Sequence, residues 1–145
     1  KAPVLPLDDV ATRLEPGVRT AELCAGEAGS AERICLDALA PELDAGRHTA
    51  VLADLDEESF LAGFDALQQA ALSSPEPNLW VLADATPEEL HAFTWQWGPA
   101  FEIRLAPAAL LRPLYRRLPR SFAVEDGRVT ATWAGLPPLG ATHTD

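Results

Sequence analysis

The chain has 145 residues, of which 48% are hydrophobic and 23% charged, a composition typical of one globular domain with its own core. Its formal net charge of −11 argues against a dedicated nucleic-acid or anionic-membrane binder, because such proteins need clustered positive charge. The sequence has no apolar run of about 18 residues, so we predict that this stretch of chain does not insert into a membrane. It lacks methionine and begins Lys-Ala-Pro, which favours a fragment whose natural start, with any targeting signal or anchor, lies upstream.

Both cysteines lie in two short candidate strands near the N-terminus, residues 18–24 and 32–36. If these strands pair antiparallel, Cys24 and Cys35 lie opposite each other and can form a disulfide. Two buried free thiols are the alternative, since free cysteine packs well as a small hydrophobic residue. We predict the disulfide, which would favour an oxidising compartment.

Two strands in the middle of the chain are predicted to be buried on both faces. Residues 48–54 form a nearly continuous apolar run, and residues 79–83 form a second one. A helical pattern separates them, and a strand–helix–strand unit requires a parallel strand pair with a right-handed crossover. We therefore expect these two strands to be parallel neighbours in one sheet.

Two helices are expected in the same part of the chain. The first opens at Asp56 or Glu57 and runs to about Leu72, with apolar residues at helical spacing, namely Phe60, Phe64, Leu67 and Ala71. The second opens at Thr86, which is followed by proline and two glutamates, and it ends near Gly98. Each helix therefore has one apolar stripe with which to cover the sheet.

A β-hairpin is predicted near the C-terminus. Asp126-Gly127 lies between alternating apolar residues and predicts a structural turn of type I′, which needs positive φ at both central positions. The antiparallel strands are expected at 121–125 and 128–133. The alternation places Phe122 with Val124 on one face of the first strand, and Val129, Ala131 and Trp133 on one face of the second.

The order of these elements resembles the thioredoxin fold. The strand–helix–strand–helix opening corresponds to residues 48–96, and Leu118-Pro119 stands where that fold has a cis-proline before its third core strand. The Phe-x-Val-x-Asp-Gly-x-Val hairpin at 122–129 is similar to that of TlpA/ResA-like thioredoxin domains. The resemblance implies an α/β fold in which helices flank a mixed sheet, here with an N-terminal β-hairpin extension.

A narrower similarity, to the C-terminal soluble domain of bacterial DoxX-type membrane proteins, is carried by residues 115–119, 126–129, Trp133 and 136–137. This resemblance implies a membrane module before Lys1 and a location on the extracytoplasmic face of a bacterial membrane, on the periplasmic or cell-surface side. The organisation that we expect is an arm and hairpin packed on the core, a thioredoxin-like core and a flexible tail, at residues 1–47, 48–137 and 138–145 respectively.

The chain departs from the oxidoreductases of the thioredoxin family at their active site. Those enzymes place Cys-x-x-Cys at the start of the first helix, whereas residues 54–60 here read Asp-Leu-Asp-Glu-Glu-Ser-Phe. We therefore predict a non-catalytic binding or scaffolding domain, whose partner is another protein or its own membrane module. The alternative is an atypical thiol–disulfide oxidoreductase that uses Cys24 and Cys35.

Five residues are candidates for contact with a partner. A short helix with an internal proline is predicted over 107–117. Arg116 and Arg117 at its end, together with Arg120, could form a positive rim around Pro119. Ion pairs with the protein's own carboxylates are the alternative for these arginines. Trp95 is expected to lie outside the core stripe of its helix, where it forms either a contact surface or a cover for a neighbouring loop.

No metal or cofactor is expected. The histidines are scattered, without the spacing of a metal site, at His48, His91 and His143. The acids that follow the first buried strand could bind a divalent cation, but acids in a first helical turn more often interact with the helix dipole. The sequence also has no glycine-rich phosphate loop and no Gly-x-Ser-x-Gly motif.

Overall fold

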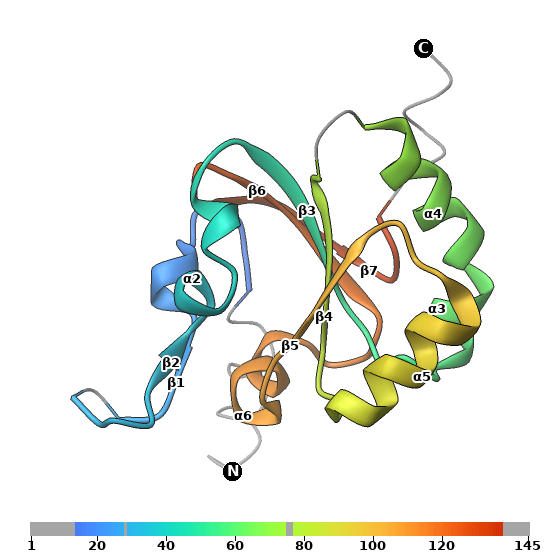
Figure 1. Ribbon diagram of the computed structural model, residues 1–145. Coiled ribbons are helices and arrows are strands. Elements are labelled where there is room, and N and C mark those ends of the chain that lie inside the picture. The colour runs from blue at the N-terminus through green and yellow to red at the C-terminus, as the bar shows by residue number, and fades with distance from the viewer. Residues whose placement is uncertain (1–13, 28, 75–76, 138–145) are drawn as a thin grey trace, which may run out of the picture.

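The computed structural model describes residues 14–27, 29–74 and 77–137, and its centre is a five-stranded mixed sheet of order β5-β4-β3-β6-β7 (Figure 1). The strands are β3 (Arg47–Leu52), β4 (Leu79–Ala83), β5 (Glu102–Leu105), β6 (Arg120–Glu125) and β7 (Arg128–Ala134). The β3–β4 and β4–β5 pairs are parallel, and the β3–β6 and β6–β7 pairs are antiparallel. The predicted α/β fold, with its parallel pair and its C-terminal hairpin, is therefore confirmed.

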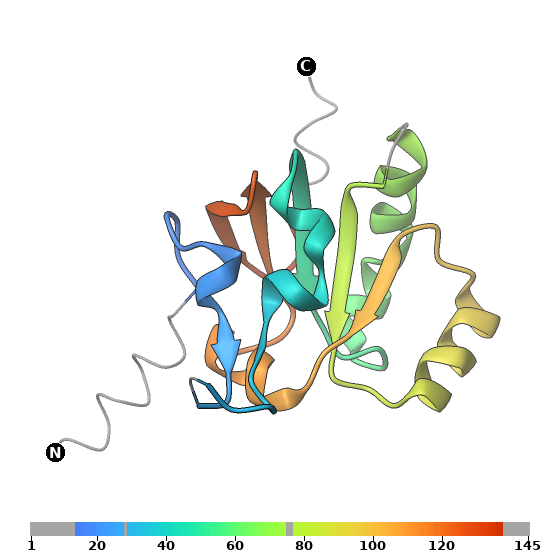
Figure 2. The same ribbon diagram turned by 60° about the vertical axis from the view of Figure 1, so that its left-hand side comes forward.

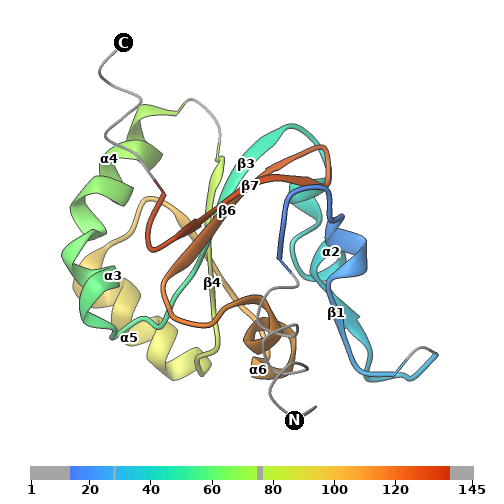
Figure 3. The ribbon, with the colours of Figure 1, turned by 180° about the vertical axis from the view of Figure 1, so that it is seen from behind.

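Separate layers cover the two faces of the sheet, as Figures 1 and 2 show. One layer consists of α3 (Glu58–Ala62), α4 (Phe64–Ser73) and α5 (Pro87–Trp97). The other consists of short elements, namely η1 (Thr20–Glu22), β1 (Cys24–Ala25), β2 (Ile34–Cys35), α2 (Leu36–Leu39), η2 (Pro41–Asp44), α6 (Ala108–Leu111) and η3 (Arg112–Leu114). The view from behind in Figure 3 shows the same separation, with α3, α4 and α5 on one side and α2, β1 and α6 on the other.

The buried strands supply both cores because successive side chains point to opposite faces. In β3, Ala50 and Leu52 pack with the short elements of the N-terminal extension and α6, whereas Val51 packs with the helices on the other side. The five residues of β4 are all buried in the same alternating way. The nearly continuous apolar runs of the sequence therefore reflect a sheet that is covered on both faces.

The first predicted helix is broken in two at Gly63. Helix α3 ends at Ala62, and α4 begins at Phe64. A Cβ atom at Gly63 would collide with the Leu136 side chain, so the break is where the C-terminal segment packs against this layer. Glycine inside a helical pattern costs only about 1 kcal/mol, and the pattern alone therefore gave a continuous helix.

The faces of β7 differ from the prediction because of a β-bulge. The β6–β7 register shifts between Ala123 and Val124, so that Val129 pairs with Val124 while Ala131 pairs with Ala123. Cross-strand partners lie on the same face of a sheet, so Val129 lies on the opposite face from Ala131. The prediction that they share a face was wrong, because the extra residue reverses the alternation.

The N-terminal extension pairs with the sheet before it forms its own hairpin. The Gly17 N–H donates to the Val129 carbonyl at 2.7 Å, and the Val129 N–H donates to the Val18 carbonyl at 2.8 Å. The chain then turns through η1, and the first predicted strand is reduced to β1, which pairs with β2. The prediction of one continuous strand over 18–24 is therefore wrong, because the two ends of this segment pair with different strands.

The predicted helix over 107–117 is also shorter than expected. Helix α6 ends at Leu111, and η3 follows as a 3₁₀ turn that contains Pro113, whose ring has no N–H to continue an α-helix. Arg116 lies beyond both elements.

The expectations for the arm up to residue 13 and for the tail 138–145 fall outside the described residues. In the part of the chain that is described, no helix is long and apolar enough to cross a membrane.

Candidate functional site

The candidate site is a pocket at the carboxyl ends of the parallel strands β3 and β4. Asp54 follows β3 and Asp84 follows β4, and loops at this edge of an α/β sheet are the usual place for ligand sites. The pocket has a volume of about 360 Å³ and lies between these two loops, α3 and α5. Four carboxylates contribute to its lining, from Asp54, Asp56, Asp84 and Glu89.

The remaining wall of the pocket is largely apolar, from Leu55, Leu61, Ala85, Phe93 and Trp97. The rings of Phe93 and Trp97 are nearly parallel, with centroids 5.9 Å apart. Phe93 is buried and Trp97 is half-buried, so the aromatic wall continues into the core of this layer. The pocket therefore combines an acidic part with an apolar part.

Helix caps hold the two loops in place. The Thr86 hydroxyl accepts from the Glu89 N–H at 3.0 Å, and the Glu89 carboxylate accepts from the Thr86 N–H at 2.8 Å, which forms a capping box at the start of α5. At the start of α3, the Glu57 carboxylate accepts from the Phe60 N–H at 3.0 Å. Some of the acids after β3 and β4 therefore stabilise helix ends, as the sequence analysis expected of them.

Asp54 is the pocket residue whose carboxyl group has a raised pKa. Partial burial raises the pKa of the carboxyl group of Asp54, a residue that is exposed overall, and the negative charges of Asp56, Asp84 and Glu57 raise it further, whereas Arg112 opposes them. At Asp54, partial desolvation and the neighbouring carboxylates therefore outweigh the effect of Arg112. Among the described residues, no group of three or more acids, histidines or cysteines is arranged to hold a metal ion.

The loop that contains Pro119 and leads into β6, residues 115–119, is called the proline loop and lies beside this pocket. The Leu118–Pro119 bond is cis, as predicted, and it directly precedes β6, where Arg120 pairs with Leu52 at the end of β3. Tyr115 belongs to the same region. Burial raises the pKa of its hydroxyl, Arg112 lowers it, and the negative charges of Asp54 and Asp84 raise it. The acidic loops and the proline loop therefore lie at the same end of the sheet, at the carboxyl ends of β3 and β4.

The structure separates the five predicted contact residues into two groups. Pro119 is buried, and the half-buried Arg120 guanidinium donates to the Leu114 carbonyl at 2.8 Å and to the Leu14 carbonyl at 2.9 Å. Arg120 therefore stabilises the proline loop by linking it to the carbonyl groups of Leu114 and Leu14. The other three residues are exposed on the surface, namely Arg116, Arg117 and Trp95, and the Trp95 side chain has a relative exposure of 88%.

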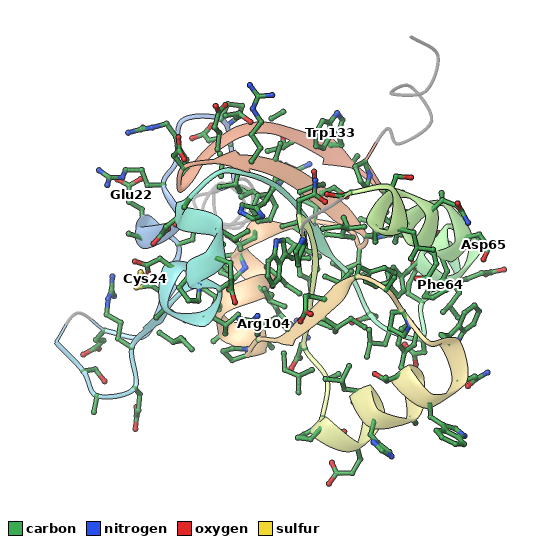
Figure 4. All side chains as sticks on the ribbon, turned by 45° about the horizontal axis from the view of Figure 1, so that its top comes forward. Glu22, Cys24, Phe64, Asp65, Arg104 and Trp133 are labelled. Carbon is green, nitrogen blue, oxygen red and sulfur yellow. A yellow bond between two sulfur atoms is a disulfide. The ribbon has the colours of Figure 1, made fainter. Side chains whose placement is uncertain are left out.

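The disulfide forms as predicted, and Cys24 is the direct antiparallel partner of Cys35. Cys24 is buried and Cys35 is half-buried. The hairpin that they close lies on the opposite side of the sheet from α4, as Cys24 and Phe64 show in Figure 4. The two cysteines are thus on the other side of the sheet from the apolar wall of the acidic pocket.

The pocket was not predicted from the sequence. The acids after the first strand were expected only as metal ligands or dipole partners, without a connection to Asp84 and Glu89. A usable signal was present, because acids that follow two neighbouring parallel strands must meet at one edge of the sheet. The apolar wall gave no such signal, since Phe93 and Trp97 also belong to the core stripe of their helix.

Comparison with known proteins reveals similarity at the level of structure. No protein-family model and no curated protein matches the sequence. Among solved structures, a thiol:disulfide interchange protein of the thioredoxin family from Chlorobium tepidum has a TM-score of 0.62 at 11% identity, covering 92% of this chain and 95% of that one. A thio-disulfide isomerase from Thermus thermophilus has a TM-score of 0.59 at 18% identity, covering 90% and 94% of the two chains.

A third solved structure, the pneumococcal exposed lipoprotein thioredoxin Etrx1 from Streptococcus pneumoniae, has a TM-score of 0.57 at 13% identity, covering 78% of this chain and 89% of that one. At these identities the likeness concerns the fold. The sheet order, the flanking helices and the proline before β6 agree with it. The chain therefore has a thioredoxin-like fold.

Proposed function

We propose that this chain is a non-catalytic, thioredoxin-like domain that binds a protein partner. In this proposal residues 48–137 form the binding core, and residues 1–47 form an extension packed on it. The observation that carries the proposal is the placement of the cysteines. Both are bonded to each other in the N-terminal hairpin, and carboxylates occupy the loop after β3, where thioredoxin oxidoreductases carry their Cys-x-x-Cys.

The chemistry of that loop supports a binding role. An attacking thiol must ionise, and a helix N-terminus or a nearby cation normally lowers its pKa. Here the loop contains Asp54, Asp56 and Glu57, whose negative charges would raise the pKa of a thiol. The loop is therefore unsuited to thiol–disulfide exchange, and it presents charge that a partner can recognise.

We further propose that the domain lies on the extracytoplasmic face of a bacterial membrane, as the soluble part of a DoxX-type protein. A disulfide supports an oxidising compartment. One structural neighbour is described as an exposed lipoprotein, which agrees with such a location. The partner is then another protein at the membrane or the membrane module of the same chain.

The contact surface that we propose includes Trp95 on α5 together with Arg116 and Arg117 near the proline loop. An exposed tryptophan is a frequent anchor in protein interfaces, because it buries a large area and loses little conformational entropy on binding. Pro119 and Arg120 contribute indirectly, by shaping the loop that carries the two exposed arginines.

The catalytic claim is tested by insulin reduction with dithiothreitol. We expect the rate with the protein to equal the rate with dithiothreitol alone, and the Cys24→Ala/Cys35→Ala variant to behave identically. Turnover that is present in the parent and absent in this variant would contradict the proposal. It would favour the second candidate function, described next.

The second candidate is a thiol–disulfide oxidoreductase that uses the Cys24–Cys35 bridge. Its support is that Cys35 is only half-buried and that structural neighbours are described as thiol:disulfide interchange proteins. Equilibration with glutathione buffers distinguishes the two functions. A bridge that stays oxidised throughout the buffer range favours a structural disulfide, and one that exchanges rapidly favours the enzyme.

The contact surface is tested by photo-crosslinking in cells, with a photoreactive amino acid at position 95, 116 or 117 of the full-length protein. We expect adducts with a membrane protein, or within the chain's own membrane module, at these positions. Leu72 of α4, with a relative exposure of 64%, is the control position. Equal adducts at position 72 would contradict a localised contact surface.

A further inference from the structure

We propose that the pocket at the ends of β3 and β4 binds the side chain of a lysine or arginine residue from a partner protein. This proposal rests on the binding role proposed above and assigns it a recognition chemistry. The pocket combines the two features that such a side chain needs, carboxylates for the cationic head and an apolar wall for the aliphatic stem.

The acidic part of the pocket comes from two loops and one helix. Asp54 and Asp56 belong to the loop after β3, Asp84 to the loop after β4, and Glu89 to the first turn of α5. Glu89 is engaged in the capping box, so the other three carboxylates are the main partners for a cation. At Asp54, Arg112 opposes the negative charges of neighbouring carboxylates, which raise the pKa despite it.

The raised pKa of Asp54 agrees with this interpretation. It results from burial together with the negative charges of three neighbouring carboxylates. A cation bound among these groups would favour the ionised form and reverse the direction of the shift.

The apolar part sets the shape of the ligand. Phe93 and Trp97 present aromatic surface, which accommodates a methylene chain and attracts an ammonium or guanidinium group. A volume of about 360 Å³ is near the lower end of the range for small-molecule sites, about 300 to 1,000 Å³. It suits one extended side chain with its neighbouring backbone.

The position of the pocket favours a residue of a protein over a free amine. Helix α5 contributes to the pocket and also carries the exposed Trp95, which we propose as an interface anchor. Trp95 does not itself line the pocket, so a partner surface must extend across α5 to cover Trp95 and also insert a basic side chain into the pocket. The acidic chain, with its net charge of −11, also complements a basic segment.

The test is an NMR titration of the ¹⁵N-labelled protein with three short peptides and one free amine. The peptides are acetyl-Leu-Lys-Leu-amide and its norleucine and glutamate counterparts, and the free amine is spermidine. We expect the lysine peptide to shift the backbone amides of Leu55, Ala85 and Phe93. We expect the norleucine peptide to bind about tenfold more weakly, since it keeps the stem and lacks the charge.

A matched pair of double variants tests the location. Asp54→Asn/Asp84→Asn removes two carboxylates of the pocket, and Asp65→Asn/Glu88→Gln removes two acids of α4 and α5 that lie outside it. We expect about tenfold weaker binding of the lysine peptide by the first variant and less than about a twofold change for the second. Equal weakening in both would show attraction by net charge alone and would overturn the proposal.

Two further outcomes would also overturn it, namely equal binding of the lysine and norleucine peptides, or tighter binding of spermidine than of the lysine peptide. These results are independent of the insulin assay. Reductase activity together with specific lysine binding would contradict the non-catalytic function and support the lysine-binding pocket. No reductase activity together with no specific lysine binding would contradict only the proposal for the pocket.

Discussion

The two layers that cover the sheet are built in different ways. The layer of α3, α4 and α5 is aromatic, and Phe60, Phe64 and Phe93 pack with ring centroids 5.9 to 6.0 Å apart. The layer formed by the N-terminal extension and α6 is mainly aliphatic and rich in buried leucines. The first layer depends on packing of amphipathic helices, and the second needs further links because its elements are very short.

Those links connect segments that are far apart in the sequence. The Asp126 carboxylate accepts from the Gly46 N–H at 2.8 Å, and the Gly127 N–H donates to the Leu43 carbonyl at 2.9 Å. The Thr20 hydroxyl donates to the Asp44 carboxylate at 3.0 Å. The tip of the C-terminal hairpin therefore anchors the extension, and a disulfide closes the extension's own hairpin. Packing of amphipathic helices stabilises one layer, whereas the other adds hydrogen bonds and a covalent bond to its aliphatic packing.

The largest expected effect tests the aromatic layer. Phe60 is fully buried between Phe93 and Phe101, so Phe60→Ala should lower the free energy of unfolding by about 3–5 kcal/mol. Urea unfolding followed by circular dichroism measures it. Leu72→Ala, at an exposed position of α4, is the control and should change stability by less than about 0.5 kcal/mol. Similar losses in both variants would contradict a layer held by packing.

The disulfide should have the next largest effect. Replacing both residues, Cys24→Ala with Cys35→Ala, should cost about 2–3 kcal/mol, because the bridge limits the unfolded chain across a sequence separation of 11 residues. Thermal unfolding of the variant and of the oxidised parent measures the loss. A parent that unfolds at the same temperature with and without reductant would show that the bridge adds no stability to this layer.

The hairpin tip should contribute less. Gly127 has φ of +81°, and a Cβ atom there would lie 3.1 Å from Asp44 Oδ1. Gly29 has a similar φ of +83° with no atom within 4 Å of the added Cβ. Gly127→Ala should therefore cost about 1 kcal/mol more than Gly29→Ala in urea unfolding, since both carry the backbone penalty and only one disturbs the anchor. Equal losses in the free energy of unfolding for the two variants would contradict the role of the hairpin tip as an anchor for the extension.

A smaller effect is expected at the salt bridge between η2 and β5. Arg104 lies 3.2 Å from Glu42, donates to the Leu39 carbonyl at 2.8 Å and packs over the Trp80 ring. The hydrogen bond from Arg104 is the main cause that lowers the pKa of Glu42. The stabilisation is therefore present above the unfolded pKa of the glutamate and is lost as the pH falls through its folded pKa.

Glu42→Gln should accordingly lower stability at neutral pH by about 0.5 kcal/mol or less, because the carboxylate is exposed and screened by solvent. The difference from the parent should vanish in acid. Urea unfolding at a series of pH values measures it. A constant difference at all pH values would assign the effect to something other than the charge.

The smallest effect has the opposite sign and belongs to the pocket. Burial and neighbouring acids raise the pKa of Asp54, so its ionised form destabilises the folded state above that pKa. Asp54→Asn should stabilise the protein at neutral pH by about 0.3 kcal/mol or less after solvent screening, and the gain should disappear as the pH falls toward the unfolded pKa. A variant less stable than its parent at neutral pH would contradict an uncompensated acidic pocket.

Local signals in the sequence were sufficient for most elements of the fold. The apolar runs of β3 and β4 and the Asp126-Gly127 turn with positive φ at both positions follow from preferences that act over a few residues. The disulfide was also predictable as a possibility, and it forms because β1 and β2 pair in a register that makes Cys24 the direct partner of Cys35. Such features need no knowledge of distant segments.

Tertiary contacts decided the features that the sequence analysis missed. Leu136 packs against Gly63, where the helix breaks, and the edge of β7 pairs with the chain at Gly17 and Val18. The pocket likewise exists only because parallel pairing brings Asp54 and Asp84 to one edge of the sheet. Periodicity reports which face of an element is apolar, but it does not report which distant segment covers that face, because that choice depends on packing and hydrogen bonds formed only in the folded chain.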